Sequence, residues 1–196
     1  MDPFELLKTD HRKVEQLFSQ LESASGKQKL EVFKQIKTEL ELHTQIEEKI
    51  FYPALEEPEE THDLALEAYE EHAVVKDLLK QLGRARTAND EWEAQAKVLQ
   101  ENVEHHVEEE ENELFAKAQA ALGEEELEEL GERMEAEKAR KQRGSTSKKS
   151  GAAKKSASKT KSASTAAKRA RPSKKGTSKS SASKKSRSKK SAAKKR

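Results

Sequence analysis

The chain has 196 residues, with 39 Lys and Arg, 37 Asp and Glu, and a formal net charge of +2. The small net charge conceals a division: residues 144–196 carry 20 basic and no acidic residues, whereas residues 1–143 carry a net charge of −18. The chain has no cysteine, no run of about 18 apolar residues and no secretory leader, which argues against a disulfide framework, thiolate chemistry and a membrane span. We therefore expect a cytoplasmic protein that has no membrane partner.

Five segments with helical periodicity follow one another in the acidic part of the chain. We predict helices over residues 3–23, 27–51, 61–83, 89–121 and 124–143. The first four are long, amphipathic and joined by short loops, so consecutive helices should pack antiparallel. The predicted fold class is all-α: an up-down-up-down four-helix bundle over residues 1–143, with a short fifth helix and a disordered basic tail.

Polar residues interrupt the apolar faces of all four long helices. Each helix carries one inward histidine, and two of these histidines are followed four residues later by a glutamate on the same face. The six residues are His11, His43, Glu47, His72, His106 and Glu110. Helix geometry places the histidines at depths of about 12–22 Å from the same end of the bundle. Because a buried carboxylate is costly unless it is paired or binds a metal, we predict a metal site here.

The donor types and a repeat within the chain sharpen this prediction. Imidazole and carboxylate without thiolate suit iron, manganese or zinc. Residues 43–54 and 106–117 are similar in pattern, so we expect the bundle to consist of two related helix hairpins. His105 and Glu109 form a rival pair beside His106, but their helix face is mostly polar and we expect them to be exposed.

The segments around these residues resemble the hemerythrin family, in the form of the bacterial HHE cation-binding domains. The resemblance covers about residues 3–140 and rests on residues 10–14, 43–53, 71–72 and 106–110. It implies a non-haem di-iron site with two oxo- or hydroxo-bridged irons per chain; manganese or zinc would also fit. Both glutamates would bridge the metals and the four histidines would cap them. The implied small ligands are O2, NO and H2O2.

One position departs from the pattern of the oxygen-carrying hemerythrins. Those proteins have a further histidine one turn before the third-helix ligand, where this chain has Ala68. Tyr69, Glu71 or water can stand in as an extra ligand, and Tyr52 is either a core residue or a neighbour of the ligands. The missing imidazole argues against reversible oxygen transport and leaves an open coordination position, as sensing or redox chemistry needs.

The basic tail, residues 144–196, consists mainly of Lys, Ser and Ala and has no aromatic residue, Leu, Ile, Val or Met. Such a segment cannot bury a core, so we expect it to be disordered. Its composition resembles histone H1-like tails, and its lysines predict non-specific binding to duplex DNA. RNA, polyphosphate and the chain's own acidic domain are alternative partners of the tail. A further alternative is that the tail only keeps the protein soluble. The residues expected to contact DNA are Lys148, Lys149, Lys154, Lys155, Lys168, Arg169, Lys174, Lys175, Lys184, Lys185, Lys189, Lys190, Lys194, Lys195 and Arg196.

These features together predict a hemerythrin-like metal protein tethered to DNA in the nucleoid. It would sense or protect against O2, NO or peroxide, or handle iron. Two alternatives stay open at this stage. One is a di-iron enzyme acting on peroxide or O2, and the other is a structural nucleoid protein whose metal site only adds stability.

Overall fold

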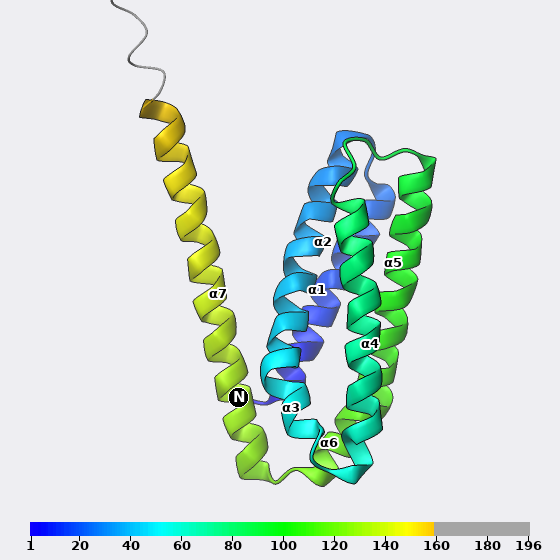
Figure 1. Cartoon of the computed structure of the whole chain (residues 1–196), viewed down its shortest axis with the longest axis vertical. Helices are drawn as coiled ribbons and strands as arrows, with labels where there is room; N and C mark the ends of the chain where they lie inside the picture. Colours follow the sequence, from blue (N-terminus) through cyan, green and yellow to red (C-terminus); the bar gives the residue numbers. More distant parts are fainter. Residues whose placement is uncertain (159–196) are drawn as a thin grey trace, which may run out of the picture. The chain divides into compact units, whose positions relative to one another are not determined.

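The computed structural model of the chain describes residues 1–158, and side chains through residue 144 (Figure 1). The described part that carries the fold belongs to one compact unit, Met1–Ala153. Every regular element in the described part is helical, as predicted. None of the helices found there is long and apolar enough to cross a membrane.

Four long helices form the predicted bundle (Figure 1). They are α1 (Pro3–Ser23), α2 (Lys27–Ile46), α4 (Glu59–Leu82) and α5 (Asp90–Glu109). α1 packs chiefly on α2 and α4 chiefly on α5, which gives the two hairpins that the internal repeat predicts. The side chains of Asp2 and Asn89 accept backbone N–H groups at the starts of α1 and α5, where the helix leaves donors unpaired.

Two wide π-helical turns interrupt what the sequence predicts to be uninterrupted helices over residues 27–51 and 89–121. η1 (Glu47–Phe51) leads into α3 (Tyr52–Leu55), and η2 (Glu110–Leu114) leads into α6 (Phe115–Ala121). In each turn a backbone N–H reaches back five residues, to Glu47 in η1 and to Glu110 in η2. The continuous-helix prediction was therefore wrong at these two places, because periodicity does not reveal a single inserted residue.

The fifth helix, α7 (Glu124–Ser158), begins where predicted but is longer than residues 124–143. Its first half covers one end of the bundle with Leu130 and Met134, which are buried. Its backbone then stays helical through residues 144–158, which the sequence analysis assigned to the disordered tail. Lys and Ala are favourable helix residues, and this local preference explains the extension. The predicted disorder of residues 159–196 concerns residues outside the described part.

The core consists of two apolar clusters that meet at one level of the bundle. The first includes Val14, Leu40, Val75 and Val103, and the second includes Leu7, Ile46, Ala68 and Leu114. On α1, α2 and α4 the inward histidine falls between a residue of one cluster and a residue of the other, and His106 of α5 falls between Val103 and Leu114 of η2 in the same way. The four histidines therefore share one level, as the depth argument predicts.

Candidate metal centre

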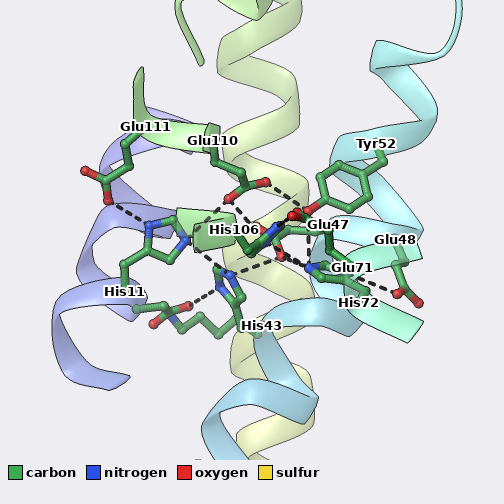
Figure 2. A network of polar contacts seen from close by, with 12 residues as sticks. His11, His43, Glu47, Glu48, Tyr52, Glu71, His72, His106, Glu110 and Glu111 are labelled. Carbon is green, nitrogen blue, oxygen red and sulfur yellow. Dashed lines mark hydrogen bonds and ion pairs between the residues drawn. The ribbon is translucent and has the colours of Figure 1, made fainter. Parts of the chain in front are cut away.

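All six of the predicted donor side chains lie together inside the bundle (Figure 2). They are buried, and Glu47 is completely inaccessible. Two overlapping groups could each hold a metal ion. One consists of His11, His43, Glu47 and Glu110, and the other of Glu47, His72 and His106. Glu47 belongs to both groups, as a bridging ligand would.

The histidines form two pairs that present their Nε2 atoms to each other. His11 Nε2 lies 3.2 Å from His43 Nε2, and His72 Nε2 lies 3.1 Å from His106 Nε2. Each pair thus combines one histidine from each helix of a hairpin.

The two buried glutamates connect the pairs. Glu47 Oε2 lies 3.1 Å from His43 Nε2 and 3.4 Å from His72 Nε2. Glu110 Oε2 lies 3.4 Å from His11 Nε2 and 3.8 Å from His106 Nε2. One oxygen of each glutamate, Oε2, therefore approaches one histidine of each pair, so each carboxylate lies where two neighbouring cations could share it.

Acidic side chains hold the outer nitrogens of the rings (Figure 2). The Nδ1 atoms of three histidines lie at hydrogen-bond distance from carboxylates: His11 from Glu111 (2.7 Å), His72 from Glu48 (3.1 Å) and His106 from Glu71 (2.7 Å). In metal sites such outer carboxylates fix the ring orientation and leave the other nitrogen free to ligate. Lys76 in turn contacts Glu48 from the surface.

The fourth histidine lacks a direct outer partner. Asp10 Oδ2 is 3.9 Å from His43 Nδ1, which is beyond hydrogen-bond distance. The other oxygen of Asp10 accepts from Lys138 of α7 at 2.5 Å. Burial raises the pKa of Asp10, but His43 and Lys138 outweigh it, and the net pKa is lowered.

The arrangement of donors fits a bound cation. A carboxylate can only accept, so a ring nitrogen that faces one carries the hydrogen, and a neutral ring then has a lone pair on its inner nitrogen. Lone pairs that face each other at 3.1 Å repel unless a proton or a metal lies between them. Both oxygens of Glu47 and Oε2 of Glu110 are buried without a hydrogen-bond partner. Two metal ions would satisfy these inner atoms together.

The pKa values of the buried donors also favour a bound cation. Burial, with the nearby charge of Glu110, raises the pKa of Glu47 well above its usual value. Burial would also raise the pKa of Glu110, but His106 and His11 outweigh it and hold the pKa at about 2. Burial lowers the pKa of His43 to about 4. The metal-free site therefore contains one carboxylate that resists ionisation and a histidine that resists protonation.

Among the extra ligands considered from the sequence, the structure brings only Tyr52 among the inner donors. Its hydroxyl donates to Glu110 Oε1 at 2.9 Å and lies 3.2 Å from His72 Nε2. Tyr69 points elsewhere: its hydroxyl donates to Glu56 at 3.0 Å. The structure therefore does not place Tyr69 where it could replace the absent imidazole near Ala68: its half-buried ring packs edge-on against Tyr52, and its hydroxyl is held by Glu56. Glu71 supports the outer nitrogen of His106 instead of reaching the inner group.

The wide turn η1 explains why Tyr52 reaches the site. A π-helical turn brings residue i+5 back over residue i, so Tyr52 lies above Glu47. In a regular helix the same residue would face away. Tyr52 is completely buried.

Sequence reasoning considered Glu71 but missed the other three outer carboxylates, although each is next to a predicted ligand in the sequence. Asp10 precedes His11, whereas Glu48 and Glu111 follow Glu47 and Glu110. Adjacent residues on a helix point about 100° apart, so these acids belong to the sides of the site. His105 is exposed as predicted. The basic residues predicted to contact DNA, Lys148 to Arg196, lie outside the part whose side chains are described.

Space next to the centre is limited. A cavity of about 10 Å³ is lined by all four histidines together with Val75 and Val103. A larger groove of about 430 Å³ runs between α1 and α5 and includes His11 and Glu111 in its lining. The groove therefore borders His11, at one edge of the donor cluster.

Comparisons with known proteins agree with this fold and identify a cation-binding domain. The hemerythrin HHE cation binding domain family matches residues 2–118, and the chain belongs to that family. A solved structure, the Rv2633c homolog from Mycobacterium kansasii, which is a hemerythrin HHE cation binding domain-containing protein, superposes with a TM-score of 0.63. It is 28% identical, and the alignment covers 71% of this chain and 86% of that one.

A longer relative is described as a DNA nickase. A DNA nickase from Nostoc sp. (strain PCC 7120) is 30% identical over 149 residues, which is 76% of this chain. The chain spans only 42% of that relative's length.

Proposed function

We propose that this protein is a non-haem di-iron protein that binds or senses O2, NO or peroxide, or handles iron. The observation that carries the proposal is the crossed arrangement of Glu47 and Glu110 between two Nε2 pairs. The pair His11 and His43 would hold one ion, and the pair His72 and His106 would hold the other. Iron fits this donor set, and manganese or zinc would fit it as well.

The bound ions would supply redox chemistry and an electrophilic position for a small ligand, and the chain supplies the surroundings. The outer carboxylates fix the rings, and the apolar residues Val75 and Val103 exclude bulk water from the cavity. The hydroxyl of Tyr52 supplies a hydrogen-bond donor within the inner cluster. The groove beside His11 would admit molecules of the size of O2, NO or H2O2.

Metal analysis with the visible spectrum of aerobically purified protein tests this proposal. We expect about two irons per chain, with absorption bands of a bridged di-iron centre. The variant His72→Ala/His106→Ala should lose at least one ion, whereas the surface variant His62→Ala should keep both. A metal content that is equal in these two variants would contradict the ligand assignment.

A second candidate, a di-iron enzyme that consumes peroxide or O2, is favoured by the asymmetry of the two groups. The group with His72 and His106 has three members, whereas the other has four, and Ala68 stands where an oxygen carrier has an imidazole. Fewer protein ligands leave positions for a substrate. Repeated turnover of H2O2, in place of a single spectral change per site, would favour the enzyme.

We further propose that the basic tail tethers the protein to DNA in the nucleoid. Its 20 positive charges support this, and the Nostoc relative, named as a DNA nickase, is a protein that acts on DNA. Lysine–phosphate binding releases counterions, so affinity should fall steeply as salt rises. Truncation after residue 143 should abolish the retardation of duplex DNA in a gel. DNA binding by the truncated chain, or binding that is insensitive to salt, would contradict this proposal.

A further inference from the structure

A second group of metal-ligand side chains lies outside the hemerythrin centre, between α4 and α5. It consists of Glu71, His105 and Glu109, and one potential ligand atom of each lies within 4.8 Å of the others. His105 Nε2 is 3.3 Å from Glu109 Oε1 and 3.8 Å from Glu71 Oε1. The imidazole is 63% exposed, so this group is accessible from solvent.

Glu71 links this outer group to the buried centre. Its Oε1 faces His105, while its Oε2 accepts from Nδ1 of His106, an inner histidine, at 2.7 Å. One carboxylate therefore touches both the outer group and a predicted ligand of the inner one.

A narrow gap runs beside this carboxylate. It has a volume of about 10 Å³, space for about one water molecule, and its lining includes Ala68, Glu71, Glu109 and Glu110. Glu110 is buried and has an oxygen without a hydrogen-bond partner. The small side chain of Ala68 leaves open the position where an oxygen-carrying hemerythrin has an imidazole.

We propose that Glu71, His105 and Glu109 form an outer site for a divalent transition-metal ion, from which the ion passes beside Ala68 to the hemerythrin centre. The route rests on the proposed di-metal function, but the outer site does not. One imidazole and two carboxylates suit such an ion, and the surplus negative charge attracts it. The inner ligands are enclosed by four helices, so an ion needs a polar path that already contains donors.

Calorimetric titration of the metal-free, full-length chain with Zn2+ tests the outer site. We expect three ions per wild-type chain and two in His105→Ala/Glu109→Gln, which leaves Glu71 and its bond to His106 in place. The control His62→Ala/Glu60→Gln makes the same change of residue types at the exposed start of α4 and should bind three. Equal binding by the wild type and His105→Ala/Glu109→Gln would overturn the outer site.

The rate of metal uptake tests the route. After stopped-flow mixing with Co2+, the visible bands of the inner ions should appear about tenfold more slowly in His105→Ala/Glu109→Gln, with the same final intensity. An unchanged rate would overturn the route. A wild-type chain that binds only one ion, lost in His105→Ala/Glu109→Gln, would contradict the di-metal function and support the outer site. A chain that binds two inner ions and no third would contradict the outer site alone.

Discussion

Lys138 of α7 donates a hydrogen bond of 2.5 Å to Asp10 of α1, and Asp10 lies directly beside the outer nitrogen of His43. Both partners are largely shielded, with side-chain exposures of 19% and 9%. One oxygen of Asp10 therefore pairs with α7, while the other faces a candidate metal ligand at 3.9 Å, beyond hydrogen-bond distance.

Lys138→Ala should lower the free energy of unfolding more than Lys49→Ala, which removes another lysine that pairs with α7. Lys138→Ala leaves Asp10 with a shielded charge and no cation, so we expect the free energy of unfolding to fall by about 1–3 kcal/mol. The control Lys49→Ala breaks an ion pair with Glu137 in which the lysine is 51% exposed, and should cost less than about 1 kcal/mol. Urea unfolding followed by circular dichroism measures both. Equal losses would show that the Asp10 contact has no special weight.

Gly131 should be intolerant of a side chain because α7 crosses the N-terminus at this residue. A Cβ atom there would overlap the carbonyl group of Met1. Gly131→Ala must push the segments apart, and we expect a loss of about 1–3 kcal/mol in unfolding free energy. Gly144→Ala is the matched control in the same helix, because a Cβ at Gly144 meets no atom within 4 Å.

The control should gain stability from better helix propensity, by up to about 1 kcal/mol. Thermal melts of the two variants would therefore shift in opposite directions. A Gly131→Ala variant as stable as wild type would mean that α7 does not pack against the N-terminus.

The sequence is sufficient to predict the bundle and the level of the six donors, because both follow from helix periodicity. A histidine at an apolar position, such as His72, is visible as an exception to a regular pattern. The two π-helical turns do not interrupt the hydrophobic pattern in a comparable way. Pro53 follows η1 and removes one backbone donor, whereas η2 has no proline. Both turns begin with two glutamates at equivalent positions of the internal repeat, but a pair of glutamates also occurs in the regular helix α4, so it does not mark a π-helical turn.

The surroundings of the site are less predictable for a related reason. Tyr52 reaches Glu110 only because η1 adds a residue to the turn, and an analysis assuming regular helices directs it elsewhere. Glu71 faces both His105 and His106 only because α4 and α5 pack at a particular distance. Contacts between helices depend on their mutual rotation, which a single sequence does not contain.

Tyr52→Phe should change the centre without changing the packing. The substitution removes one hydroxyl, which donates to Glu110 and lies against His72. We expect the metal-free chain to lose about 1 kcal/mol of stability. We also expect the visible spectrum of the iron-loaded chain to shift, because a group next to two ligands is lost.

Tyr69→Phe is the control for this experiment. Its hydroxyl donates to the exposed side chain of Glu56, away from the inner donors. Stability and spectrum should both stay close to those of wild type. If Tyr69→Phe shifts the spectrum and Tyr52→Phe does not, the placement of the two rings is wrong.

Glu47→Gln should have opposite effects on the metal-free and metal-loaded chains. Glu47 is completely buried, has no hydrogen-bond partner on either oxygen and lies near the second carboxylate, Glu110. Glutamine keeps the shape, removes the cost of a buried acid, and offers an N–H to the lone pair of His43 or His72. We expect the metal-free variant to be more stable than wild type by about 1–3 kcal/mol.

Metal should stabilise the wild type but have little effect on this variant. A ligand at 1,000 times its dissociation constant adds about 4 kcal/mol to the stability of a folded protein, and the amide is a poor substitute for a bridging carboxylate. Melting curves with and without Fe2+ under anaerobic conditions measure both effects. A buried carboxylate that serves to bind metal lowers the stability of the chain when no metal is bound. If Glu47→Gln instead destabilises the metal-free chain, the Glu47 carboxylate serves packing rather than metal binding.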